Sequence, residues 1–260
     1  MIKLYEHPLS PYAQKVKIAL IEKGIAFEVA MPDLLSGGDA AFRAANPRLE
    51  VPALVDGDTT VFDSTIILEY LEDKWPKRAL LPATPAERAR ARSLEEVCDT
   101  QYEAVNWGLM EIRAFKRATG AMADAMIVQA GQQIAGLNAY LDRALGASDF
   151  FNGAQFGWAD LSVVPHVNAA AGFNGFAPPA GSALARWLER VQQRPSVKRV
   201  IAEAVASLAG FEMLPQLVAS GMFVREYRDH RLEWMFRSGG IDIVLDGIKK
   251  KNIRFSAELA

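Results

Sequence analysis

Two short segments carry groups that could hold a small charged peptide. Val51-Pro52 follows an Asn46-Pro47 turn and begins a short β-type run. A Val-Pro bond there suits a rigid corner that can take the cis form, and it leaves the Val51 N–H and C=O open to an extended partner. Asp63-Ser64 starts an apolar helical run, so its carboxylate, hydroxyl and unpaired amides can hold a charged ligand group. Together the two segments predict a binding site for a small peptide.

The elements that must position these segments alternate between strand-like and helical patterns. Residues 12–23 repeat apolar side chains with charged ones between them and end at Gly24, as a helix does. A turn at residues 56–58 separates two strand-like runs and predicts a hairpin. We therefore predict a β-α-β-α-β-β-α order, which is a small mixed sheet with helices on its faces. The strands are residues 2–5, 27–31, 52–55 and 60–62, and the main helices are residues 12–23 and 64–74.

After Lys74 the pattern becomes helical. Two proline-containing stretches between residues 75 and 85 indicate a linker, and the chain beyond Ala86 is almost entirely helical in pattern. An apolar stripe runs through residues 89–116 and includes Cys98. We interpret Cys98 as a small buried hydrophobe, because no base or basic cluster is placed to ionise its thiol.

Composition limits the classes of protein that fit. The chain has 260 residues, of which 50% are hydrophobic and 23% charged, a globular composition long enough for two domains. The formal charge of −2 supplies no broad basic field, so a nucleic-acid partner is not expected. No apolar run is long enough to span a membrane, and the single cysteine favours a reducing compartment, so we expect a cytoplasmic protein without a membrane partner. The three histidines are scattered without paired acidic or cysteine residues, so no metal site is expected.

A second capping pattern lies in the helical half, at Gly157-Trp158-Ala159-Asp160. Gly157 is the expected N-cap, and Asp160 is the N3 residue whose carboxylate can reach back to the N–H of the cap. This pattern indicates structure rather than chemistry. Its loss should cost on the order of 1 kcal/mol of stability.

In combination, these motifs resemble a cytosolic glutathione S-transferase of the serine type, over about residues 1–205. The resemblance implies a thioredoxin-like α/β N-terminal domain (residues 1–80) that binds glutathione, and an all-α domain (residues 86–210) that binds a second substrate. It also implies a homodimer and a role in detoxification. The motifs that carry it are Ser10-Pro11-Tyr12, residues 15–20, Asn46-Pro47, Val51-Pro52-Ala53-Leu54, residues 63–71 and Gly157-Trp158-Ala159-Asp160.

The family's glutathione contacts carry over to matching positions of this sequence. By resemblance, the main chain of Val51 binds the cysteinyl backbone, and Pro52 is the cis residue that shapes this edge. Asp63 and Ser64 receive the γ-glutamyl end, and Tyr12 is a further candidate contact. The glycyl carboxylate has no assigned partner, because residues 34–39 contain no Lys or Arg, and two arginines further on, Arg43 and Arg48, are only candidates.

Ser10 is the catalytic candidate that the resemblance indicates. A free thiol titrates near a pKa of about 8.5, so a hydroxyl that donates to sulfur beside a helix N-terminus favours the thiolate. The alternative is that Ser10 only caps the helix that follows. The loop has no cysteine, which excludes dithiol redox chemistry of the thioredoxin and glutaredoxin kind.

The pocket for a small hydrophobic electrophile is expected on one long helix. Trp107 and Met110 could equally be helix-packing core. The four wall candidates are Trp107, Met110, Arg113 and Arg117. The chemistry is conjugation, or a substitution such as dehalogenation or ether cleavage, and the alternative function is a non-catalytic interaction module of the same fold.

A C-terminal extension (residues 211–260) continues beyond the part that resembles the family. It is too apolar to stay solvated, so we expect it to pack across the mouth of the active site or onto a partner subunit.

Overall fold

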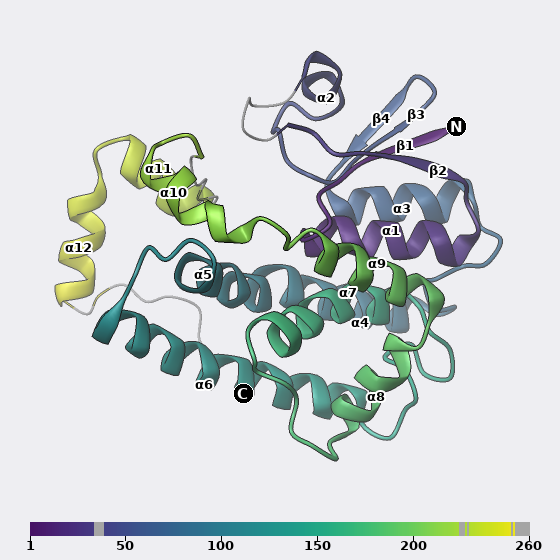
Figure 1. Cartoon of the computed structure of the whole chain (residues 1–260). Helices are drawn as coiled ribbons and strands as arrows, with labels where there is room; N and C mark the ends of the chain where they lie inside the picture. The colour runs from purple at the N-terminus through teal and green to yellow at the C-terminus, as the bar shows by residue number, and fades with distance from the viewer. Residues whose placement is uncertain (34–38, 224–226, 228, 251, 253–260) are drawn as a thin grey trace.

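The structure is a computed structural model that describes residues 1–33, 39–223, 227, 229–250 and 252. Near the N-terminus, a mixed sheet is flanked by helices, and the rest of the described chain is helical (Figure 1). The strand order is β2-β1-β3-β4, with β1 and β2 parallel and the other pairs antiparallel. The strands are β1 (Ile2–Tyr5), β2 (Phe27–Ala30), β3 (Ala53–Asp56) and β4 (Thr59–Phe62).

Helices cover both faces of this sheet. α1 (Pro11–Lys23) and α3 (Ser64–Lys74) pack on one face, where Leu4 of β1 enters the main core. The short α2 (Ala40–Ala45) lies on the other face, where its Phe42 contacts Tyr5 with ring centroids 5.2 Å apart. Adjacent residues of one strand thus serve opposite faces. The predicted thioredoxin-like arrangement is confirmed.

The helical part surrounds one central helix, α7. The long helix expected over residues 89–116 is divided by a π-helical turn and ends at Arg113. Every residue of α7 from Trp158 to Val167 is buried, so this helix has no solvent-facing side before its end. The elements are α4 (Pro85–Val97), η1 (Cys98–Tyr102), α5 (Glu103–Arg113), α6 (Gly120–Leu145), α7 (Trp158–Asn168), η2 (Ala169–Phe173), α8 (Ala183–Gln192) and α9 (Pro195–Ala206).

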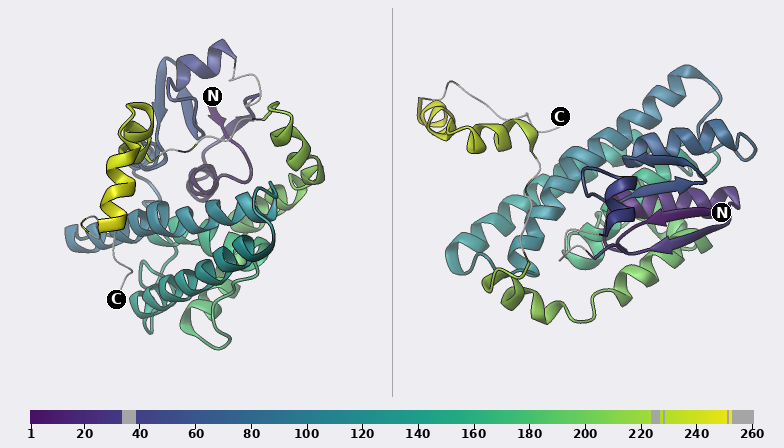
Figure 2. Two further views of the ribbon diagram at one scale, coloured as in Figure 1. Left: turned by 90° about the vertical axis from the view of Figure 1, so that its left-hand side faces the viewer. Right: turned by 90° about the horizontal axis from the view of Figure 1, so that it is seen from above.

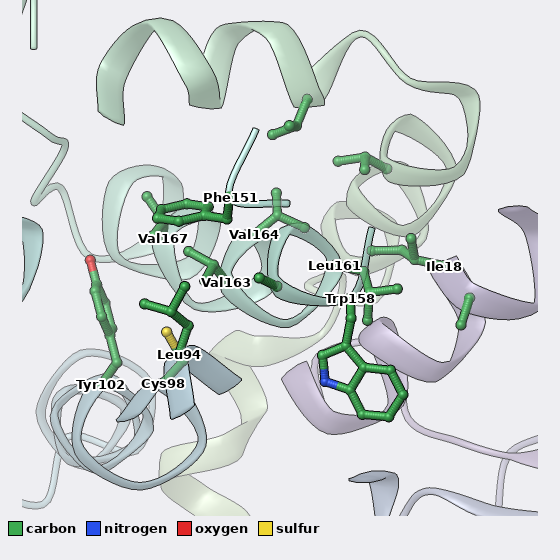
Figure 3. Packing of buried hydrophobic residues seen from close by; sticks show 14 of the residues in the cluster. Ile18, Leu94, Cys98, Tyr102, Phe151, Trp158, Leu161, Val163, Val164 and Val167 are labelled. Carbon is green, nitrogen blue, oxygen red and sulfur yellow. The ribbon is translucent and has the colours of Figure 1, made fainter. Parts of the chain in front are cut away.

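The main core lies between α7, α1 and α4. Figure 3 shows Trp158 and Leu161 of α7 near Ile18 of α1, while Cys98 faces the same helix from the other side. Cys98 is fully buried, and burial raises the pKa of its thiol far above the ordinary value. The interpretation of Cys98 as a buried hydrophobe is confirmed.

The C-terminal extension forms four short helical elements (Figure 1): η3 (Phe211–Met213), α10 (Leu214–Ala219), α11 (His230–Arg237) and α12 (Ile241–Lys250). Its described contacts with the helical part include Phe223, which stacks on Phe115 at 5.7 Å, and Tyr227, which meets Trp107. In contrast, α11 buries none of its residues and α12 buries only Gly247. The first part of the extension therefore packs on the helical part, whereas α11 and α12 bury little against the described residues; docking at the active-site mouth or on a partner subunit stays a prediction.

Candidate active site

Three chain segments meet at one end of the sheet. In the strand register, Tyr5 of β1 pairs with Ala53 of β3, and Ala53 pairs with Phe62 of β4. The end of β1, the start of β3 and the end of β4 therefore lie side by side. The loop that carries Ser10 follows β1. Val51-Pro52 leads into β3, and Asp63-Ser64 follows β4. The fold brings the main predicted glutathione-site residues to one edge.

Ser10 is the N-cap of α1. Its Oγ accepts a hydrogen bond from the Ala13 N–H at 3.3 Å, and its own N–H donates to the His7 carbonyl at 2.9 Å. Pro11 occupies the first turn, where its missing N–H costs nothing. Because the oxygen acts as acceptor, the hydroxyl proton of this half-buried side chain remains available to donate to a ligand atom.

The Val51-Pro52 corner has the predicted cis peptide bond. Pro52 is buried, and Asn46 holds the preceding turn by donating from its side chain to the Glu50 carbonyl at 2.7 Å. Between these fixed points, the Val51 N–H and C=O make no hydrogen bond to another described residue. Such groups need a partner, and an extended peptide can supply one along a strand edge.

Asp63 and Ser64 form the start of α3. The exposed Asp63 has a φ of 73°, which is unusual for a non-glycine residue, and its carboxylate caps the helix by accepting from Thr65 at 3.0 Å and Ile66 at 3.3 Å. Ser64 is buried, and its hydroxyl has no partner among the described residues. Together with the amides of the first turn, this arrangement can hold an ammonium and a carboxylate at one point.

Tyr12 faces the helical part rather than the edge of the sheet. Its hydroxyl donates to the Asp99 carbonyl at 2.7 Å. Burial, followed by the nearby charge of Glu103, raises the pKa of this hydroxyl well above its ordinary value. Tyr12 therefore stays a neutral donor that ties the start of α1 to η1.

Asp99 also belongs to a buried charged cluster that the sequence did not reveal. The ammonium of Lys15 is fully buried and pairs with Glu95 at 2.5 Å and with Asp99. Glu95 also accepts from Trp158 and, at 2.8 Å, from the hydroxyl of Thr65, one residue after Ser64. Burial acts to lower the pKa of Lys15, but the charges of Asp99 and Glu95 outweigh it and hold the pKa above the usual value. The cluster links α1 and α3 to α4, η1 and α7.

His166 extends this cluster from α7. Its Nε2 lies 3.3 Å from a carboxylate oxygen of Asp99, and its Nδ1 lies 3.6 Å from Glu103. Burial disfavours the charged imidazolium, but the two carboxylates outweigh burial, so the pKa of His166 is raised above its usual value. The two carboxylates thus favour the protonated form of this buried ring. Within the described residues, no group of three His, Cys, Asp or Glu side chains could hold a metal ion.

The four electrophile-pocket candidates lie on or just beyond α5, and two of them, Trp107 and Arg117, contact the extension. Trp107 meets Tyr227 edge to face, with ring centroids 4.6 Å apart. The Tyr227 hydroxyl donates to Glu111 at 2.9 Å, and Arg117 pairs with the same carboxylate at 2.8 Å. The two remaining candidates, Met110 and Arg113, are half-buried, and Arg113 lies over the ring of Phe176. Sequence reasoning missed Tyr227, because nothing in its local pattern indicates a partner 120 residues earlier in the chain.

The glycyl-carboxylate contact gains no assignment. Arg48 pairs with Glu50 at 2.8 Å, and the side chain of Arg43 is exposed on α2. Most of the segment that was expected to carry this contact, residues 34–38, lies outside the described residues.

A sheet of this topology, a cis-proline corner and two helix starts at one edge define a thioredoxin-like unit joined to a helical part. Residues 4–79 match the family model described as glutathione S-transferase, N-terminal domain. Glutathione S-transferase 3 of Zea mays is 31% identical over 213 residues, covering 77% of this chain and 93% of the relative.

Solved structures agree. A glutathione S-transferase from Rhodospirillum rubrum F11 superposes with a TM-score of 0.68 at 30% identity, covering 77% of this chain and 91% of that one. Rice GST1, solved in complex with glutathione, has a TM-score of 0.67 at 25% identity and covers 83% and 98%. The chain belongs to the glutathione S-transferase family, and the prediction of a glutathione transferase enzyme is confirmed.

In the part of the chain that the structure describes, no single helix is both long and apolar enough to cross a membrane. The pair formed by Pro195–Ala206 and Phe211–Ala219, bent by 47°, passes the criterion of length and composition only when the two are taken together.

Proposed function

We propose that this protein binds glutathione at the edge formed by Ser10, Val51, Pro52, Asp63 and Ser64, and that it uses the thiolate as a nucleophile. The observation that carries the proposal is the main chain of Val51, which has no hydrogen-bond partner among the described residues and lies beside two helix N-termini at one end of the sheet. An extended tripeptide with an ammonium and two carboxylates complements these groups in shape and charge. Glutathione is the co-substrate, and no metal takes part.

Ser10 supplies the activation. A lowering of the thiol pKa by about two units corresponds to about 2.7 kcal/mol of preferential thiolate stabilisation. A charge-assisted hydrogen bond from the Ser10 hydroxyl and the amides at the start of α1 can supply an amount of this order. Tyr12 contributes to the glutathione site only through its main-chain N–H in the first turn of α1, because its hydroxyl donates to the Asp99 carbonyl.

The acceptor is a small hydrophobic electrophile. We infer that Trp107, Met110, Arg113 and Arg117 line its pocket, and that Tyr227 of the extension forms the outer wall, since it touches Trp107 and shares Glu111 with Arg117. The reaction is conjugation, or a substitution such as dehalogenation or ether cleavage. The glutathione-binding domain is residues 1–80, the electrophile-binding domain residues 86–210, and the enzyme acts in detoxification as a cytoplasmic homodimer.

The test separates the chemistry of Ser10 from its capping role. Ser182 is the matched control, because it caps α8 through the Ala185 N–H at 3.0 Å as Ser10 caps α1 through Ala13. Each Ser→Ala change should cost about 1 kcal/mol of stability. Only Ser10→Ala should lower the turnover of a generic aryl halide, by about 25-fold at pH 7, because a thiol with a pKa of about 6.5 is about three quarters ionised there and one with a pKa of about 8.5 only about 3%. Ser10→Thr should retain part of the activity.

Two results would contradict the proposal. If Ser10→Ala and Ser182→Ala keep equal turnover, Ser10 is only a cap. If the wild-type protein is not retained on immobilised glutathione and turns over no aryl halide, the fold serves as a non-catalytic interaction module.

A further inference from the structure

Two helices of the extension expose large apolar side chains to solvent. On α11, Trp234 is 66% exposed and Phe236 58% exposed. On α12, Leu245 is 56% and Ile248 48% exposed on one side of the helix, and Ile243, which is 69% exposed, points to the opposite side. Soluble proteins expose single apolar residues widely, but a run of them on neighbouring helices marks a surface that binds something.

α12 gains little packing from the described parts of this chain. It has 10 residues, and isolated helices shorter than about 12 to 15 residues are marginal in water. Of its residues, only Gly247 is buried against described parts of the chain. Ile241, Val244, Leu245 and Ile248 follow the i, i+3, i+4, i+7 spacing of a helix that packs along one stripe. Figure 2 shows α12 projecting from the body of the molecule, where a second molecule can reach it.

The charges beside this stripe run in a definite order. Asp242 and Asp246 lie in the first part of α12, and Lys249 and Lys250 end it. A second α12 in the antiparallel direction, with the two Leu245 side chains near the centre, places each Asp242 opposite Lys249 of the other copy. A parallel second copy places like charges together, which is unfavourable. The helix is therefore complementary to itself in one orientation only.

The same charges argue against an anionic membrane or a nucleic acid. Over the whole extension, residues 211–260, the sequence carries seven acidic and eight basic side chains, so the two signs nearly balance. Surfaces that bind phosphates or anionic lipids present an excess of Lys and Arg on the polar face.

We propose that two copies of this chain meet through α12. The two α12 helices pack antiparallel about a two-fold axis, and α11 lies next to each of them in the chain. A two-fold interface uses the same patch on both molecules, so its charges must be complementary to themselves, as they are on α12. The inference does not depend on glutathione chemistry. It also holds whether or not the copies meet at another surface.

Cross-linking tests this contact directly. Leu245→Cys places a thiol near the two-fold centre, and the only native cysteine, Cys98, is fully buried and does not compete. Val205→Cys on α9 is the control, because Val205 is a 63% exposed apolar residue outside the extension. With a short bifunctional maleimide, Leu245→Cys should give at least about ten times the covalent dimer of Val205→Cys, the ratio expected for preferred over random encounter.

Charge exchange identifies the partner and its orientation. In the Leu245→Cys background, Asp242→Lys should lower the yield of dimer, and the combined change Asp242→Lys with Lys249→Asp should restore it. Equal yields at positions 245 and 205, or no recovery in the charge-exchanged variant, would overturn the proposal.

A membrane or the last residues of the same chain, bound at the apolar face of α12 in place of a second copy, would give different results. If the protein binds phospholipid vesicles while cross-linking stays at the control level, the face belongs to a membrane. If cross-linking appears only in a variant that ends at Asn252, the last residues of the same chain cover the face. Either result refutes the second copy.

Discussion

Charged side chains lie inside this molecule where α1 meets the helical part, whereas apolar side chains lie outside on α11 and α12. Lys15 is fully buried between Glu95 and Asp99, yet Trp234 is 66% exposed. The difference shows that burial follows the availability of partners rather than residue type alone. Lys15 has two carboxylates in reach, and so its charge is matched. The apolar side chains of α12 lack a comparable cover among the described residues.

A second buried pair repeats this principle. Lys17 pairs with Glu6, which follows β1, and with Glu203 of α9 at 2.5 Å. Burial raises the pKa of Glu6 above its usual value, although Lys17 acts against this. Two charged clusters thus join α1 to the helical part at separate points. Such pairs fix an orientation more than they add stability, because desolvation offsets their attraction.

The largest expected effect is that of breaking the first cluster. Lys15→Met removes the cation and leaves Glu95 and Asp99 buried without it, so the free energy of unfolding should fall by about 3 to 5 kcal/mol. Denaturant titration measures this loss. Lys74→Met is the control, because Lys74 pairs with Asp56 at the surface, and its unfolding midpoint should move far less. Equal shifts in the two variants would remove the distinction between buried and exposed charges.

Asp160 gives the next effect, as a dependence on pH. Its carboxylate accepts from the Phe151 N–H at 2.8 Å, the Gly157 N–H at 3.0 Å and the Trp187 indole at 2.8 Å, yet burial outweighs these donors and raises the pKa to about 6. Between pH 3.8, the ordinary pKa, and about 6, the unfolded chain is ionised while the native state keeps the proton. The protonated Asp160 therefore contributes its full share of stability below this pH window, and this share is lost as the pH rises through the window. The total loss is about 3 kcal/mol of unfolding free energy.

The measurement compares unfolding free energies of the wild type and Asp160→Asn across this window. Other carboxylates titrate in both proteins, so their difference isolates Asp160. The wild type should lose stability relative to the variant as the pH rises. A difference that is constant with pH would show that Asp160 has an ordinary pKa in the native state.

Sequence reasoning succeeded where the signal was local. The cis corner at Val51-Pro52, the N-cap at Ser10 and the cap at Asp63 each depend on a few adjacent residues. The Lys15 cluster joins residues 80 and 84 positions apart, and no local spacing indicates such a pair. A lysine on an amphipathic helix is ordinarily solvated, so its burial depends on a neighbour that only the fold supplies.

Asp160 shows how a correct local prediction can be incomplete. The capping contact with Gly157 was predicted and is present. The contacts with Phe151 and Trp187 come from other parts of the chain. The cost of about 1 kcal/mol expected for losing this residue is therefore too small, because each buried donor left unpaired adds about 1 to 3 kcal/mol.

The smallest expected effect is that of removing the exposed helices α11 and α12. A chain that ends at Asp229 keeps Tyr227 and removes α11 and α12, which bury only Gly247 among the described residues. At concentrations where copies are apart, its free energy of unfolding should differ from that of the full chain by less than about 1 kcal/mol, the usual range for surface changes. A loss above about 2 kcal/mol in thermal or denaturant unfolding would show that these helices are part of the core.

The most direct test of the central claim is the pKa of the glutathione thiol in the bound complex, followed by the ultraviolet absorption of its thiolate as a function of pH. Ser10 beside the start of α1 predicts an apparent pKa about two units below the free value of about 8.5, and a return toward that value in Ser10→Ala but not in Ser182→Ala. A bound thiol that titrates near its free pKa in the wild type would contradict the account.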